Sequence, residues 1–137
     1  MSKKRNRNHQ ILLEMKKIYY PLDIQNSDKY LDWMGWPITS ENMPSYHHIE
    51  KVSSLKSKNE YDGATIENGA YLGTQSHQVL HYIEQIDKKL YEAWNYVFLL
   101  INKMRCYPID DIWRMIDNLN NITIKTIEEN NERKTRR

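Results

Sequence analysis

The sequence has little cysteine and no long apolar run. Its single cysteine, Cys106, excludes an internal disulfide and any zinc site built from paired cysteines. No apolar stretch approaches the roughly 18 residues that a membrane span needs. The residues after the positively charged start, 1–5, are too polar for a signal peptide. We therefore expect a cytoplasmic protein with no membrane partner, in which Cys106 is a small buried residue of a helix.

The length and the charge distribution indicate one globular domain with basic ends. At 137 residues the chain can bury one core but not two. The net charge is only +2, but residues 1–17 hold six basic residues and one acidic residue, and residues 125–137 hold five basic and three acidic residues. Basic ends could contact nucleic-acid phosphates. Short charged tails also serve solubility alone, so both roles stay open.

The first third of the sequence predicts a helix followed by an irregular segment. Apolar residues at helical spacing predict a helix that reaches Tyr20 and is ended by Pro21. A glycine and two prolines then break regular structure between residues 30 and 44. Trp33 and Trp36 are large enough to anchor this segment to a core, which we favour over base stacking.

The middle of the sequence predicts an antiparallel pair of strands. Residues 46–52 alternate in the manner of a strand, which places His47 and His48 on opposite faces. The polar stretch 53–62 predicts a loop ending at Gly63. A second short strand is expected over residues 64–72, interrupted by the turn dipeptide Asn68–Gly69.

The rest of the sequence predicts amphipathic helices. Apolar residues from Val79 to Met104 alternate spacings of four and three, which predicts one long helix, or two joined near Lys89, capped by Thr74 or Ser76. This apolar face packs on the protein's own core or forms a dimer seam. Pro108 is expected to end this helical pattern. A last amphipathic helix is expected to run to about residue 119, where the chain becomes polar and frays.

Four of the five histidines fall in two tight pairs. His77 and His81, four residues apart on a helix, lie on one face and can share a metal ion. The adjacent His47 and His48 cannot easily serve one ion together, because neighbouring strand residues face opposite sides. One of them can bind metal while the other takes a proton, since an imidazole pKa near 6.5 suits general-base work. Asn68 can hydrogen-bond the backbone beside His48 and fix the ribbon.

These residues resemble the HNH nucleases of the ββα-metal fold. The matching residues are Tyr46-His47-His48-Ile49, then Asn68-Gly69-Ala70-Tyr71-Leu72, then His77-Gln78-Val79-Leu80-His81. The nine-residue step from Asn68 to His77 is the family's spacing between its central asparagine and the metal-binding helix. The resemblance covers roughly residues 31–90 and is strongest over 46–81. The chain departs from the family in having only Gly63 where a Gly-Gly is common, and in lacking the paired cysteines of many members.

The resemblance implies a role for each matching residue. His47, His77 and His81 resemble metal ligands, as in the three-histidine sites of the DNase colicins. His48 resembles the general base that activates water, and Asn68 resembles the structural asparagine of the catalytic site. The implied activity is metal-dependent hydrolysis of DNA phosphodiester bonds, leaving a 5′-phosphate and a 3′-hydroxyl. Three imidazoles favour Zn, Ni, Mn or Co as the divalent ion, while Mg remains compatible with the family.

The resemblance also implies an overall organisation. The expected fold class is α+β, a ββα-metal (HNH) core with additional C-terminal amphipathic helices. We expect a basic, partly helical segment over 1–29, the nuclease core with a long helix over 30–105, a C-terminal helix over 106–124 and a basic, flexible tail over 125–137. Three loop lysines could steady the substrate phosphate, although we favour a solvated loop as their explanation: Lys51, Lys56 and Lys58.

Several alternatives stay open at this level. The chain could be a catalytically inactive HNH-like subunit that binds nucleic acid or serves a structural role. The substrate could be RNA rather than DNA, and the protein could act alone, as a homodimer or within a larger assembly. A composition rich in Ile, Asn and Lys suits a phage or mobile element with an AT-rich genome. No zinc finger or helix-turn-helix motif accompanies the histidines, so little sequence specificity is expected.

Overall fold

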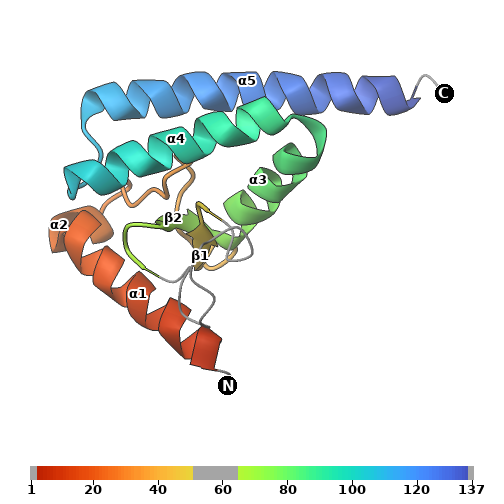
Figure 1. Ribbon diagram of the computed structural model, residues 1–137. Helices are drawn as coiled ribbons and strands as arrows, with labels where there is room; N and C mark the ends of the chain where they lie inside the picture. Colours follow the sequence, from red (N-terminus) through yellow and green to blue (C-terminus); the bar gives the residue numbers. More distant parts are fainter. Residues whose placement is uncertain (1–2, 51–64, 136–137) are drawn as a thin grey trace.

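A computed structural model describes residues 3–50 and 65–135 of the chain, as an α+β fold (Figure 1). One two-stranded antiparallel sheet is surrounded by helices. The elements follow in the order α1 (Lys3–Tyr19), α2 (Leu22–Gln25), β1 (Pro44–His48), β2 (Gly69–Gly73), α3 (Thr74–Ile86), α4 (Lys88–Met104) and α5 (Asp110–Thr135). Within these described residues, every helix is too short or too polar to span a lipid bilayer.

The hairpin lies between α1 on one side and α3 and α4 on the other (Figure 1). In the antiparallel register His47 faces Ala70 and His48 faces Gly69. Helix α3 begins at Thr74, directly after the last residue of β2, so no loop separates the sheet from the helix. This direct connection keeps the first turns of α3 beside β1, and it gives the hairpin-then-helix order that the sequence predicted. The expected strands are confirmed as a pair, but β1 begins two residues before the expected start at Tyr46 and ends at His48, and β2 covers Gly69–Gly73. The expected strand ends and loop within 51–64 lie outside the described residues.

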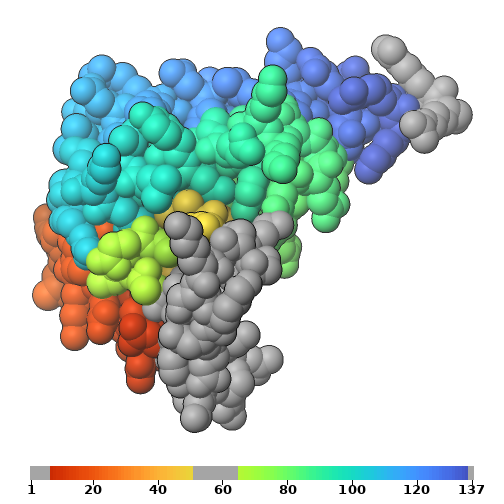
Figure 2. Space-filling view, in the orientation of Figure 1, coloured from red at the N-terminus to blue at the C-terminus, as the bar shows by residue number. Residues whose placement is uncertain are grey.

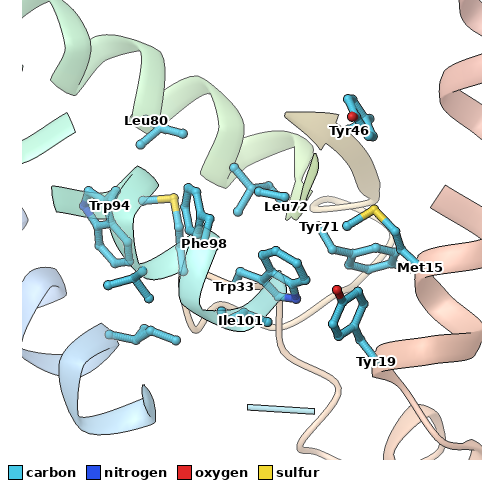
Figure 3. Packing of buried hydrophobic residues seen from close by; sticks show 14 of the residues in the cluster. Met15, Tyr19, Trp33, Tyr46, Tyr71, Leu72, Leu80, Trp94, Phe98 and Ile101 are labelled. Carbon is cyan, nitrogen blue, oxygen red and sulfur yellow. The ribbon is translucent and has the colours of Figure 1, made fainter. Parts of the chain in front are cut away.

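A core rich in aromatic side chains holds the helices to the hairpin (Figure 3). Trp33 is fully buried, and its ring meets Tyr19 of α1 edge-on with ring centroids 5.0 Å apart. On its other side Trp33 meets Phe98 of α4. Such rings bury a large area and favour edge-to-face contacts. The expectation that Trp33 anchors its irregular segment to the core is therefore confirmed.

The apolar pattern expected between Val79 and Met104 forms two helices, joined at Asp87. This residue adopts an extended conformation and its carboxylate accepts the backbone N–H of Leu90, which caps α4. A carboxylate at this position also interacts favourably with the positive end of the helix dipole. The break lets α4 turn back along the hairpin while α3 stays attached to β2 (Figure 1).

Helix α3 is capped by a residue distant in sequence. The expected cap by Thr74 or Ser76 is wrong, because the preceding Gly73 holds the N-cap position and the side chain of Asn42 supplies the acceptor. The Asn42 Oδ1 atom accepts the backbone N–H groups of Gln75 at 2.9 Å and Ser76 at 3.2 Å. A Cβ atom on Gly73 would meet the Asn42 side chain at 2.1 Å, so only glycine allows this approach.

A buried carboxylate reinforces the same junction. Asp32, which is fully buried, accepts backbone N–H groups from Met34, Trp36 and Gly73 at 2.9–3.0 Å. Burial raises the pKa of this carboxyl, while the hydrogen bonds act in the opposite direction. The loop before β1 is thereby tied to the point where β2 becomes α3.

Two further expectations are wrong. Cys106 is exposed, because the left-handed conformation of Arg105 (φ 54°) ends α4 and places Cys106 in the following turn. The last helix does not end near residue 119 but continues to Thr135. Polar side chains fix this extension, since Trp94 donates to the buried Thr123 at 3.0 Å and Asn130 donates to the Tyr82 hydroxyl at 2.6 Å.

Candidate metal centre

Three histidines from two elements converge in the folded chain. His47 comes from β1, and His77 and His81 come from α3, where they lie one turn apart. One ring nitrogen from each of the three lies within 4.8 Å of the others. A tetrahedral ion with bonds of about 2.0–2.1 Å would hold such nitrogens about 3.3 Å apart, closer than the 4.8 Å within which they lie. The three histidines that the sequence predicted as ligands thus form a cluster able to hold a metal ion.

The exposed fraction of the three histidines increases from His47 through His77 to His81. His47 is buried with 1% of its surface exposed, His77 is half-buried, and the side chain of His81 is 49% exposed. His47 meets His77 and His81 edge-on, at ring-centroid distances of 5.2 and 5.8 Å. The cluster therefore has a closed end in the core and an open end at the surface.

A hydrogen bond from another helix fixes the ring of His47. Its Nε2 atom lies 2.9 Å from the Oδ1 atom of Asn95, a buried residue of α4. Because an amide oxygen only accepts, this contact is a hydrogen bond when the imidazole carries its proton on Nε2. The lone pair of His47 is then on Nδ1, which is the nitrogen left for a metal ion.

The other two rings are held in the same manner. Ser45 Oγ donates to the Leu72 carbonyl at 3.2 Å, so toward His77 Nδ1, 3.1 Å away, it acts as the acceptor. His81 Nδ1 lies 3.3 Å from the carboxylate of Glu84, which also accepts. With the proton of each ring on Nδ1, both contacts are hydrogen bonds and a lone pair remains on Nε2. Bonds of this kind to the second nitrogen orient histidine ligands in metal sites.

The electrostatics keep the inner histidines neutral. Burial lowers the pKa of His47 to about 3, against the smaller opposing effect of its hydrogen bond to Asn95. Burial also lowers the pKa of His77 to about 4, and the nearby His81 and His48 act in the same direction. Both rings are uncharged at neutral pH, which is the state in which imidazole binds metal.

The donor set fits a borderline transition metal. Three imidazole ligands suit Zn, Ni, Mn or Co better than Mg. Among the described residues no fourth histidine, cysteine or carboxylate joins the group. The open end faces a surface pocket of about 480 Å³, lined by Ser45, Thr74, His77, Gln78, His81, Tyr82 and Gln85. A site with three protein ligands and an open side is typical of catalytic rather than structural zinc.

His48 lies beside the cluster but is not a member of it. Its ring meets the edge of Tyr46, with centroids 4.7 Å apart, on the face of β1 opposite to His47. It is near enough for its charge to lower the pKa of both His47 and His77. His48 is thus outside the cluster but electrostatically coupled to His47 and His77.

Asn68 closes the end of the hairpin next to His48. Its side chain accepts the backbone N–H of Glu50 at 2.8 Å and donates to the Glu50 carbonyl at 2.9 Å. The Asn68 carbonyl also accepts the N–H of Ile49 at 2.9 Å. The amide thus fixes the backbone immediately after His48, which is the contact that the sequence suggested. Three other predicted site residues, Lys51, Lys56 and Lys58, lie outside the described residues.

The reading of the sequence missed the residues that orient the ligands. Ser45, Glu84 and Asn95 carry no motif, and their roles depend on contacts between elements. Asn95 nevertheless offered one signal, because it is a buried polar residue on a helix whose neighbouring positions are apolar. Buried polar side chains normally have a hydrogen-bond partner, so such a position points to a specific contact.

No family model, no curated protein and no solved structure matches this chain. The function is therefore inferred from the cluster, its orienting hydrogen bonds and the pocket beside it.

Proposed function

We propose that this protein is a metal-dependent endonuclease that hydrolyses DNA phosphodiester bonds in the manner of the HNH nucleases. The observation that carries the proposal is the three-histidine cluster, in which each ring keeps one lone pair for an ion and one end opens to a pocket. The hairpin-then-helix order of the elements supports the same assignment.

The residues take distinct roles in this proposal. His47, His77 and His81 hold the ion, which when bound polarises the phosphate and neutralises charge on the departing oxygen. His48 takes the proton from the attacking water, since an imidazole is suited to general-base work near neutral pH. Asn68 positions His48 by fixing the backbone of Glu50, two residues further along the chain.

Two features favour a catalytic ion over a purely structural one. Structural zinc sites are usually closed by four protein ligands, most often thiolates, whereas this cluster has three imidazoles among the described residues. The outer ligand His81 is exposed and lines a pocket whose other walls bear hydroxyl and amide side chains. Those side chains can hydrogen-bond a nucleic-acid backbone.

A cation lies at the border of the same pocket. The Lys134 amino group of α5 stands 5.6 Å from the ring centroid of Tyr82, and Tyr82 lines the pocket with His77 and His81. Figure 2 shows the basic end of α5 projecting past α3. This placement supports a polyanionic substrate, because a phosphate backbone is bound largely through such contacts.

Plasmid cleavage by wild type and His48→Ala, each with Mg²⁺, Mn²⁺, Ni²⁺ and Zn²⁺, tests the proposal. We expect relaxed or linear product from the wild type with at least one ion, and a loss of about 10²–10⁴-fold in His48→Ala. Zinc binding should be unchanged in that variant, because His48 is outside the cluster. The control is His9→Ala, which alters an exposed histidine of α1.

Each contrary outcome has a separate meaning. Cleavage that survives in His48→Ala would exclude His48 as the base. Tight zinc binding without cleavage under any ion, together with unfolding by a chelator, would indicate a structural zinc protein. Retained DNA affinity without cleavage would indicate an inactive binding subunit.

A further inference from the structure

Asn95 lies outside the hairpin and α3, yet it makes the polar contact that defines the inner ligand. It comes from α4, is 8% exposed, and accepts a hydrogen bond from His47, which is 48 residues away in sequence. The His47 ring also lies against the rings of Tyr91 and Phe98 on α4, whose centroids are 6.1 and 5.9 Å away. These aromatic contacts limit the space around the imidazole, but they do not select which nitrogen carries the proton.

We propose that Asn95 is a positioning residue that locks His47 in the Nε2–H tautomer and so presents Nδ1 to the metal ion. The inference rests on the proposed metal site and makes α4 a functional part of it. In the absence of the amide, a buried imidazole in an apolar setting can carry its proton on either nitrogen and rotate about its bonds. Only one of those arrangements offers Nδ1 to the ion.

The same face of α4 carries a matched amide. Asn102, two turns further on and 7% exposed, donates to the Gly69 carbonyl of β2 at 2.8 Å and accepts from the Tyr19 hydroxyl at 2.8 Å. Thus Asn95 holds β1 through a histidine, and Asn102 holds β2 through its backbone. The two residues are equally buried and differ in whether they contact a ligand.

The tautomer can be observed directly in the metal-free protein. Long-range ¹H–¹⁵N correlation spectra of histidine-labelled wild type, with the His47 signals identified by their loss in His47→Gln, show which ring nitrogen is protonated. We expect protonated Nε2 and unprotonated Nδ1 at neutral pH. A protonated Nδ1 in the wild type would overturn the inference, and this measurement needs no variant of Asn95 to fold.

Zinc affinity of matched variants provides the second test. Asn95→Leu should bind zinc about 10- to 100-fold more weakly, which is the usual effect of losing a partner behind a histidine ligand. Asn95→Asp keeps an acceptor for Nε2–H and should bind at least as tightly as the wild type. Asn102→Leu should lower the unfolding temperature but leave zinc affinity within about threefold, since it does not touch a ligand. Affinities are measured by competition with a chelating indicator at a temperature where all variants are folded.

The results separate this inference from the proposed function. If the wild type binds zinc and cleaves DNA while Asn95→Leu matches it in tautomer and affinity, the role of Asn95 is refuted and the nuclease proposal stands. Equal losses in Asn95→Leu and Asn102→Leu would also refute it, because a general loosening of α4 would explain both. If the wild type binds no metal, the proposed function and the ligand-presenting role of Asn95 both fail, while the spectra still decide which tautomer His47 adopts.

Discussion

The two ends of the histidine cluster lie in opposite environments. His47 is 1% exposed, packs against α4 and is held by a buried amide. The side chain of His81 is 49% exposed, lies on α3 and is held by a surface carboxylate. The inner end is therefore built by the same contacts that stabilise the fold, while the outer end is built by one turn of a helix beside a pocket. We therefore expect the inner end to be the rigid one and the outer end to be the accessible one.

Alanine substitutions of His47 and His81 should give the largest expected effect. They should differ in the free energy of unfolding but agree in the loss of zinc affinity. His47→Ala removes a buried ring and leaves the Asn95 amide without its partner, which should lower the metal-free free energy of unfolding by about 2–4 kcal/mol. His81→Ala changes an exposed site and should alter it by less than about 0.5 kcal/mol. Both variants should lose zinc affinity by more than about 100-fold and lose cleavage, since losing a ligand exceeds losing its partner. Urea unfolding in chelator and zinc titration measure the two quantities.

Equal destabilisation by His47→Ala and His81→Ala would break the comparison, because it would mean that the core does not depend on the inner ring. Retained cleavage in His81→Ala would show that the outer histidine is not a ligand.

Acid should act mainly through the inner end. The pKa of His47 is lowered to about 3 by burial, whereas an unfolded chain titrates near 6.5. Between these values the unfolded state binds a proton that the folded state does not. Stability should therefore be unaffected by this group above pH 6.5 and fall as pH decreases toward 3, by up to about 1.4 kcal/mol per pH unit.

The slope of this acid dependence is measured by urea unfolding in chelator between pH 7 and pH 4. In His47→Gln the slope of the free energy of unfolding against pH should decrease by the equivalent of about one proton. His9→Gln, which alters an exposed position on α1, should give the same slope as the wild type. An unchanged slope in His47→Gln would contradict the buried, neutral state of His47.

The stability of α3, the helix that carries the outer ligand, should depend on its N-terminal cap. Asn42→Ala removes the acceptor for the Gln75 and Ser76 N–H groups at the start of the helix that carries His77 and His81. Loss of an N-cap costs about 1–2 kcal/mol, and here the cap also joins two distant segments. The metal-free free energy of unfolding should fall by that amount. Thr39→Ala, in an exposed turn of the same loop, should change it by less than about 0.5 kcal/mol. Equal effects would show that Asn42 does not cap α3.

The local parts of this structure could be predicted from the sequence. Strand alternation separates His47 from His48, and helical spacing brings His77 above His81, because both patterns are fixed by backbone geometry. Pro21 was correctly expected to end a helix, since proline cannot continue one. Helix α4 ends at Met104, before Pro108, because Arg105 adopts the left-handed conformation. The α+β class and the order of hairpin and helix follow from the same signals.

The contacts between distant segments could not be predicted. The Asn42 cap of α3, the Asn95 bond to His47 and the Thr123 bond that extends α5 over α4 each join residues more than 25 positions apart. A polar side chain shows by its type that it needs a partner, but not which partner the fold supplies. The polar sequence after residue 119 therefore resembled a fraying end, although its threonine and asparagine side chains hold the helix to its neighbours.

The smallest expected effect lies at the outermost point of the open end, where Lys134 borders the pocket. Its amino group is exposed and near the Tyr82 ring, so it can reach a phosphate without being needed for the fold. Lys134→Ala should weaken DNA binding a few-fold at moderate salt and reduce the slope of log affinity against log salt by about 0.9, the value for one phosphate contact. The measurement is titration of a labelled duplex in a His48→Ala background, which prevents cleavage, at several salt concentrations.

Lys103→Ala removes an exposed cation near the C-terminal end of α4, away from the histidines, and should leave the slope unchanged. Equal slopes for Lys134→Ala and the unaltered background would place the substrate on another face, because a cation at the border of the occupied pocket must release counterions when DNA binds.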